Sequence, residues 1–233
     1  MVKVNKLNIS RIQIHKRRTT EKKQLKCMYT NVRSLMNKNK RDELRQKLLD
    51  DEIDMLGLTE SWTHEEVGHG EIEFSGYVCY RKDRNRSKGK ERGGGVLLYI
   101  TEQVTSFMME EEEEETESIW VRVGNTKKTE MYVGVVYRSP TIDSEGCKMM
   151  YRQIKKFSTF SMMVMGDFNF GGINWQKMES DNVGQEFFDT INDCFLTQHV
   201  IPPTRGENIL DLILTTEKDM VNNVEVDSPI ANS

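Results

Sequence analysis

Short apolar runs alternate with longer amphipathic stretches along most of the chain. Near-continuous apolar runs at residues 53–59 and 162–165 predict buried strands, because a strand covered on both faces has no polar side. Alternating apolar and polar positions at residues 119–123 predict a half-buried strand. The same reasoning predicts further strands at residues 25–30, 77–80, 96–100, 131–137, 209–214 and 223–226.

Helical spacing of apolar residues predicts three helices. One covers residues 39–50, with Leu44 and Leu48 on one face, and the others cover residues 145–160 and 184–196. Strands outnumber helices, and their order mixes β-α-β units with hairpins. We therefore predict an α/β fold, namely a four-layer α/β sandwich of two packed mixed β-sheets flanked by helices.

The N-terminal segment differs from the rest of the chain in its charge. Residues 1–24 are basic and lack a sustained apolar period, so we predict a disordered tail followed by one domain over residues 25–233. The whole chain carries a net charge of −4, so this basic arm precedes an acidic body. Such an arm suits a polyanionic partner, and the alternative is a solvated leader without a binding role.

Hydropathy and cysteine usage limit the compartment. No apolar run is long enough to cross a membrane, and the basic N-terminus lacks an apolar core segment, so we expect no secretory signal there. The four cysteines are scattered and show no metal-ligand spacing. We expect free thiols in a reducing nuclear or cytoplasmic compartment, with no membrane partner and no zinc site.

Polar side chains stand where several predicted strands end. They are Asn31, Glu60, Tyr137 with Arg138, and Asp167 with Asn169, while Asp211 interrupts the strand at residues 209–214. Strand ends on one edge of a layered fold converge in space. Carboxylates can bind a hard cation and align a water molecule, and amides, a phenol and a guanidinium can bind phosphate oxygens. This set predicts cleavage of a phosphodiester with Mg²⁺ or Mn²⁺, because its ligands would be oxygens.

Four of these residues also have a purely structural interpretation. Asn31 could cap the following loop or helix, and Tyr137 could be an aromatic residue at the edge of a sheet. Asp211 could bond to nearby backbone, and Asp167 could be an ordinary turn residue.

Six segments, in order along the chain, resemble the endonuclease/exonuclease/phosphatase superfamily. Within it they resemble the apurinic-type endonuclease domain of non-LTR (LINE-like) retrotransposons. The segments read TNVRSL (30–35), LGLTESW (56–62), RGGGVLLYI (92–100), VGVVYRSP (133–140), MGDFN (165–169) and PTRGENILDLILT (203–215).

The resemblance implies roles for the residues at the strand ends. Glu60, helped by Asn31, would bind the metal ion, and Asp167 would orient the attacking water. The phosphate would be contacted by Asn169, Tyr137 and Arg138, with Thr204 and Asp211 flanking the pocket. The implied activity is a metal-dependent nick in one strand of double-stranded DNA at a target site, by a monomer whose parent polypeptide could also carry a reverse transcriptase.

A basic stretch at residues 81–92 is a candidate for DNA contact. It contains Arg81, Lys82, Arg84, Arg86, Lys88, Lys90 and Arg92. Such residues would neutralise phosphates and make binding salt-dependent. The alternative is a solvated surface insertion.

One departure from the family pattern concerns its closing Ser-Asp-His motif. Ser233 resembles the serine of that motif, and no Asp-His pair follows it in this sequence. We therefore expect a C-terminally truncated domain with weak or no turnover. The alternatives are a phosphatase of the same superfamily and a non-catalytic remnant that binds nucleic acid or protein.

Overall fold

The computed structural model describes residues 8–14, 24–84, 93–110, 116–126, 129–228 and 230. The predicted DNA contacts Arg86, Lys88, Lys90 and Arg92, and Ser233, lie outside the described residues.

The first of two six-stranded sheets has the strand order β14-β1-β2-β3-β5-β4. Within it, β2 and β3 run parallel and the other neighbours are antiparallel. Its strands are β1 (Asn8–Ile14), β2 (Leu25–Asn31), β3 (Met55–Thr59), β4 (Tyr77–Lys82), β5 (Val96–Thr101) and β14 (Val221–Asp227).

The second sheet has the order β12-β13-β9-β8-β7-β6. Here β8 and β9 form the parallel pair, so each sheet contains one parallel pair at or near its centre. Its strands are β6 (Ser106–Met108), β7 (Ser118–Val123), β8 (Met131–Tyr137), β9 (Met162–Asp167), β12 (Thr197–Gln198) and β13 (Asp211–Thr215). A separate small hairpin joins β10 (Ile173–Asn174) to β11 (Glu179–Ser180).

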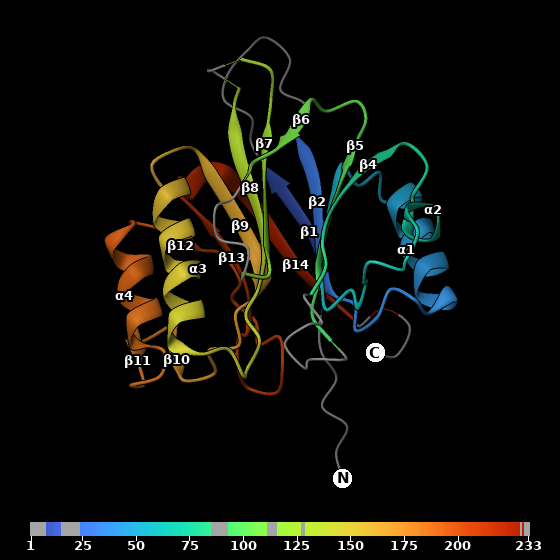
Figure 1. Ribbon diagram of the computed structural model, residues 1–233. Helices are drawn as coiled ribbons and strands as arrows, with labels where there is room; N and C mark the ends of the chain where they lie inside the picture. Colours follow the sequence, from blue (N-terminus) through green and yellow to red (C-terminus); the bar gives the residue numbers. More distant parts are fainter. Residues whose placement is uncertain are drawn as a thin grey trace.

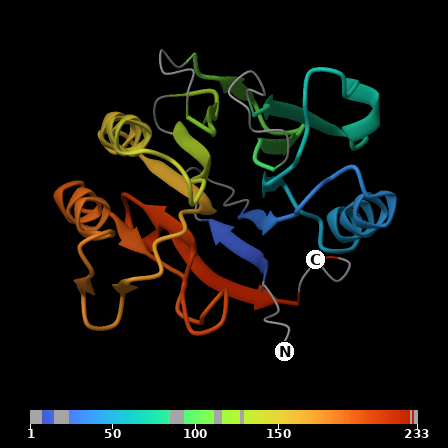
Figure 2. The same ribbon diagram turned by 60° about the horizontal axis from the view of Figure 1, so that its bottom comes forward.

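Helices cover the outer face of both sheets (Figures 1 and 2). The first sheet packs against α1 (Lys38–Asp50) and α2 (His69–Ile72), and the second against α3 (Ser144–Phe157) and α4 (Gln185–Asp193). A short 3₁₀ helix, Lys218–Met220, precedes β14. The predicted four-layer α/β sandwich with two mixed sheets is confirmed.

Helix α3 shows how local sequence sets this packing. The side chain of Asp143 accepts a hydrogen bond from the Gly146 amide at 2.8 Å, which caps the helix. Ile154 and Phe157 then fall on the buried face, as the helical spacing predicted. The ring of Phe157 stacks on that of Trp120 from β7, with centroids 4.2 Å apart. Helix and sheet are thereby locked together.

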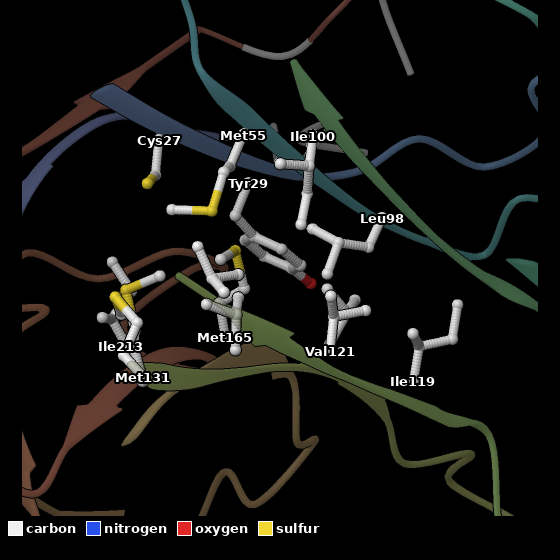
Figure 3. Packing of buried hydrophobic residues seen from close by; sticks show 14 of the residues in the cluster. Cys27, Tyr29, Met55, Leu98, Ile100, Ile119, Val121, Met131, Met165 and Ile213 are labelled. Carbon is white, nitrogen blue, oxygen red and sulfur yellow. The ribbon is translucent and has the colours of Figure 1, made fainter. Parts of the chain in front are cut away.

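The main core fills the space between the two sheets. Figure 3 shows the ring of Tyr29 reaching from β2 toward Val121 and Met165 of the other sheet. The sheets approach so closely at Gly57 that an added Cβ would lie 2.8 Å from the Met165 sulfur. This contact brings the strands of the two sheets near enough for residues at their ends to meet.

The N-terminal segment departs from its prediction. Asn8–Ile14, within the segment expected to be a disordered tail, forms β1 and pairs with β2 on one side and β14 on the other. Polar residues, including Arg11, separate its apolar positions irregularly, and its partner β14 is distant in sequence, so the local pattern does not reveal the strand. Within the described ranges, no helix is long and apolar enough to cross a bilayer.

Candidate functional site

Two parallel strand pairs, one in each sheet, place the candidate residues at one edge. Asn31 ends β2 and pairs in register with Thr59, the last residue of β3, so Glu60 follows directly beside it. In the second sheet, Tyr137 ends β8 and pairs with Asp167, the end of β9. Parallel neighbours end on the same side of a sheet, which is why residues far apart in sequence come together here.

Asn31 joins the two sheets at this edge. Its Nδ2 donates to Glu60 Oε1 at 2.7 Å and to Asp167 Oδ2 at 2.7 Å. Asn31 is 4% exposed and Asp167 is 0% exposed, so the contact between them is shielded from water, whereas the contact with Glu60 is partly buried. Carboxylates from different sheets therefore lie within hydrogen-bond reach of a single nitrogen atom.

The turn after β9 carries Asn169, held in the left-handed region at φ 54°. Its Nδ2 donates to the Arg138 carbonyl at 2.8 Å. Arg205, from the loop before β13, donates to Asn169 Oδ1 at 3.1 Å and to Asp167 Oδ2 at 3.0 Å. Arg205 thus contacts both the Asp167 carboxylate and the Asn169 carboxamide from a separate loop.

A buried lysine supports the loop that follows Asn31. Lys40 Nζ donates to the carbonyls of Val32 and Arg33 at 2.7 and 2.9 Å. Burial lowers the pKa of Lys40, and the charge of Arg33 lowers it further, whereas Glu60 acts in the opposite direction. This helix residue fixes the backbone immediately after a site residue.

Backbone strain gathers in the loops around the site. Positive φ angles occur at the non-glycine residues Arg33, Ser34, Glu60, Trp62 and Asn169. Backbone amides in the loop after β2 donate to carbonyls in the loop after β3; for example, Ser34 N–H donates to the Glu60 carbonyl at 2.8 Å. Strained residues held by their surroundings are typical of functional sites.

Tyr137 lies against an internal ion pair. Its ring faces the guanidinium of Arg84, whose Cζ is 5.7 Å from the ring centroid. Arg84 in turn bonds Glu117 at 2.7 Å, and Glu117 also accepts the Gly95 amide at 2.6 Å. Burial raises the pKa of Tyr137 above its ordinary value of 10, and the nearby carboxylates of Glu60 and Asp167 raise it further. The phenol therefore stays protonated and can donate a hydrogen bond.

Arg138 braces the turn that carries Asn169. Its guanidinium carbon lies 4.0 Å from the centroid of the Phe170 ring, and Nη1 donates to the Asn169 carbonyl at 3.3 Å. The residue is 8% exposed. Its position beside the site agrees with the location expected for it, and a phosphate contact stays a prediction.

Thr204 and Asp211 are almost completely buried, as Asp167 is. The hydroxyl oxygen of Thr204 accepts the amides of Leu210 and Asp211 at 3.0 and 3.1 Å, which closes the loop before β13. Asp211 Oδ1 accepts from the Tyr29 hydroxyl at 3.1 Å inside the sandwich. Their predicted roles in flanking a phosphate pocket stay predictions.

Two arginines of the basic stretch are engaged in ion pairs within the protein. Arg81 pairs with Asp83 and donates to the carbonyls of His64 and Val67, and Arg84 pairs with Glu117 as described above. Both side chains are largely buried, and Lys82 is half-buried. DNA contact by these three residues stays a prediction.

The donor set of the site can be compared with what a divalent ion requires. Among the described residues, no group of three or more His, Cys, Asp or Glu side chains could hold a metal ion. Mg²⁺, however, commonly takes one or two carboxylates and completes its shell with water and phosphate oxygens. Asn31 Oδ1 is buried and has no hydrogen-bond partner in the described part of the chain, so an oxygen ligand lies beside Glu60. These residues fit Mg²⁺ or Mn²⁺.

A cavity of about 400 Å³ opens next to the turn that carries Asn169. Its lining includes Gly171, Asn174, Trp175, Pro203, Glu207 and Asn208. One wall is the loop that carries Arg205, and the volume is within the range of small-ligand sites.

Three contributing residues were not identified from the sequence. Tyr29 lies inside a predicted strand, Lys40 near the start of a predicted helix, and Arg205 in a loop, where an arginine is normally solvated. The position of Arg205 directly after Thr204, within the segment 203–215, was the available signal.

The site can be set against proteins of known family and structure. The family described as Endonuclease-reverse transcriptase matches residues 131–233, which include β8, β9 and β13 with Tyr137, Asp167 and Asn169. No curated protein sequence matches the chain. The resemblance to the endonuclease/exonuclease/phosphatase superfamily is confirmed.

Several solved structures have the same fold. The endonuclease domain of TRAS1, a telomere-specific non-LTR retrotransposon, is similar with a TM-score of 0.60 and 14% identity, over 88% of this chain and 98% of that one. The mannosyl-6-phosphatase Bt3783 of Bacteroides thetaiotaomicron has a TM-score of 0.56 and 13% identity, over 83% and 86%. An endonuclease/exonuclease/phosphatase family protein from Leptotrichia buccalis has a TM-score of 0.53 and 12% identity, over 88% and 99%.

Proposed function

Because this chain has the fold of the endonuclease/exonuclease/phosphatase superfamily, and its residues 131–233 match the endonuclease–reverse transcriptase family, we propose that it is a metal-dependent DNA endonuclease that nicks one strand. The observation that carries the proposal is the bridge from Asn31 Nδ2 to the carboxylates of Glu60 and Asp167, each at 2.7 Å. It joins a candidate ligand of a cation to a candidate base.

Glu60 and Asn31 are the proposed ligands of Mg²⁺. When bound, the ion would supply positive charge that stabilises the developing negative charge on the scissile phosphate. Glu60 contributes a carboxylate and Asn31 its Oδ1, which the protein leaves without another partner among the described residues. Asn31 ends β2 and Glu60 directly follows β3, and backbone hydrogen bonds fix the chain after both strands.

Asp167 is the proposed general base. It accepts a proton from the water that attacks phosphorus, as one P–O bond forms and the P–O bond to the leaving oxygen breaks. Asn169 donates an N–H and Tyr137 its O–H to non-bridging phosphate oxygens or to the leaving oxygen. Because burial and nearby carboxylates keep the phenol protonated, Tyr137 can donate without a change in charge.

The neighbouring cavity favours a nucleic acid over a bare phosphate as substrate. Its volume of about 400 Å³ can take a group of roughly nucleotide size beside the phosphate position, and Trp175 offers an aromatic surface. The similarity to the TRAS1 endonuclease domain points the same way.

A phosphatase is the second candidate, because a mannosyl-6-phosphatase shares this fold at a TM-score of 0.56. It would use the same carboxylates but act on a terminal phosphate. A sugar-sized phosphomonoester would also fit the cavity.

The decisive experiment uses the full chain in excess over a supercoiled plasmid, with Mg²⁺ or with EDTA, and Asp167→Asn as the matched inactive control. We expect nicked circles to accumulate slowly with Mg²⁺, in keeping with the weak turnover expected from the absent Asp-His pair, and none with EDTA or with the variant. Release of phosphate from a phosphomonoester without any nicking would replace the proposal with the phosphatase. Tight DNA binding without cleavage at any Mg²⁺ or Mn²⁺ concentration would replace it with a binding role.

A further inference from the structure

Arg205 lies on a rigid turn that faces the site from outside its strands. Its amide donates to the Asn208 carbonyl at 3.0 Å, and the Asn208 amide donates back to the Arg205 carbonyl at 3.1 Å. Gly206 takes φ 62° between them, and Thr204 closes the base of the loop through two amides. The backbone of Arg205 is therefore fixed, which an ordinary solvated arginine does not require.

The guanidinium spans two groups on one turn. Nη1 donates to Asn169 Oδ1 at 3.1 Å, and Nη2 donates to Asp167 Oδ2 at 3.0 Å. The side chain of Arg205 is 26% exposed and that of Asp167 is 0% exposed, so the carboxylate of this ion pair is shielded from water. Such a pair is screened less by solvent than a surface one.

A guanidinium has only donors, and this fixes the orientation of the Asn169 amide. Oδ1 must face Arg205, so the NH₂ group must point the other way, where one hydrogen bonds the Arg138 carbonyl at 2.8 Å. Because the carboxamide is planar, the direction of the second N–H of that NH₂ group is fixed as well. The reversed amide would set an N–H against the N–H groups of Arg205, which is repulsive.

We propose that Arg205 is a positioning residue that holds the Asp167 carboxylate and the Asn169 carboxamide in one fixed relative orientation. This inference rests on the proposed function, since it assigns those two groups to the attacking water and to the phosphate. Arg205 acts through both of them at once, because its planar fork places two N–H donors side by side.

Replacement of Arg205 by lysine keeps the positive charge but removes the planar pair of N–H donors. In Arg205→Lys one ammonium can contact Asp167 or Asn169 but cannot reproduce both bonds in the same geometry. We expect a loss in kcat of about 10- to 100-fold with KM within about threefold of the parent, because a small misplacement of catalytic groups has that effect. Arg152→Lys is the matched control, since Arg152 forms an exposed ion pair with Glu145 on α3.

A double-mutant cycle tests whether Arg205 acts through Asn169. If it does, Arg205→Lys and Asn169→Ala each lower kcat, and the double variant is much less impaired than the product of the two effects. A loss of kcat in the double variant equal to the product of the two single losses would show that the residues act independently and would overturn the inference. So would an unchanged kcat, or a change confined to KM, in Arg205→Lys.

Side-chain amide NMR gives a readout that does not depend on turnover. The Asn169 NH₂ resonances of the metal-free protein should shift in Arg205→Lys and stay in place in Arg152→Lys, at an unchanged melting temperature. A parent chain that fails to nick DNA would remove the proposed function, while the Asn169 resonances would still report on the positioning. Unshifted resonances together with parent-like nicking by Arg205→Lys would remove the inference and leave the function standing.

Discussion

Asp167 and Asp211 are register partners on the antiparallel strands β9 and β13, and both are almost completely buried. The two carboxylates accept hydrogen bonds from different donors. Asp167 accepts from Asn31 and Arg205 at the edge, whereas Asp211 accepts from the Tyr29 hydroxyl at 3.1 Å within the sandwich. Burial raises the pKa of Tyr29 well above 10, and both aspartates raise it further, so the phenol remains a donor.

Tyr29→Phe should therefore destabilise the fold. It removes the donor to a buried carboxylate, and we expect the free energy of unfolding to fall by about 1–3 kcal/mol in urea denaturation. Tyr132→Phe is the control, because that hydroxyl makes a longer contact of 3.3 Å to the partly exposed Glu130. Equal midpoints for Tyr29→Phe and the parent would contradict this account of Asp211.

Glu60→Gln should weaken metal binding more than it alters the fold. Removing one negative ligand should raise the Mg²⁺ concentration for half-maximal nicking on the order of tenfold, because affinity depends on ligand charge. Binding of Mn²⁺, followed by electron paramagnetic resonance, should weaken in parallel, and EDTA should abolish nicking until Mg²⁺ is restored. Glu65→Gln, at an exposed position of the next loop, should match the parent. Identical Mn²⁺ affinity in both variants would exclude Glu60 as a ligand.

Tyr137→Phe should lower kcat without changing its pH dependence. The phenol has a pKa raised above 10 by burial and by Glu60 and Asp167, so it does not titrate below that pH. Loss of one hydrogen-bond donor to a developing charge should cost about 10²–10³ in kcat. Profiles of log kcat against pH should run parallel for variant and parent between pH 6 and 9.5. A basic limb present in the parent and absent in the variant would show that the phenol ionises.

Gly166→Ala should be strongly destabilising. Gly166 pairs with Val136 between β8 and β9, and an added Cβ would lie only 1.9 Å from the Val136 carbonyl oxygen, so backbone would have to move. We expect a loss of about 3 kcal/mol or more in the free energy of unfolding. Gly70→Ala in α2 is the control, since nothing lies within 4 Å of an added Cβ there. Unfolding of both variants at the same urea concentration would contradict the close approach.

His199 should make stability depend on pH below neutrality. Its Nε2 lies 2.7 Å from the Thr215 hydroxyl, and burial lowers the pKa of the ring below its ordinary value of 6.5. As the pH falls past 6.5, the unfolded chain takes up a proton that the folded chain still resists, so stability falls. His199→Gln removes this titration, and its free energy of unfolding should decline less than that of the parent between pH 7.5 and 5.5. Equal slopes would show that His199 is not responsible.

Regular elements with a complete local pattern were predictable from the sequence. The strand at residues 131–137 has the predicted bounds, and the strand at 25–30 extends by one residue, to Asn31. The helix at 145–160 ends at Phe157, because helical spacing does not locate a C-terminus well. Residues 209–214 were expected to form one strand, but β13 begins at Asp211, since the residues before it turn to bond Thr204.

Elements and contacts that depend on distant partners could not be predicted in the same way. Strand β1 and the short strands β6 and β12 have no strong pattern of their own and exist through pairing with neighbours. The positions of Asn31, Tyr137 and Asp167 at one edge could be predicted from the ends of their strands, because parallel neighbours end on the same side of a sheet. Arg205 reaches Asp167 only through the closed shape of its loop, which local sequence does not specify.

Strand β1 is hydrogen-bonded to β14, which lies almost the whole length of the chain away. During synthesis on the ribosome, β1 and β2 therefore emerge long before the neighbour that covers the outer edge of β1. Until β14 arrives, that edge presents unpaired amides and carbonyls to other nascent chains. Completion of this sheet consequently waits for the last of its strands to be made, and in the interval before that the open edge of β1 can pair with other chains and aggregate.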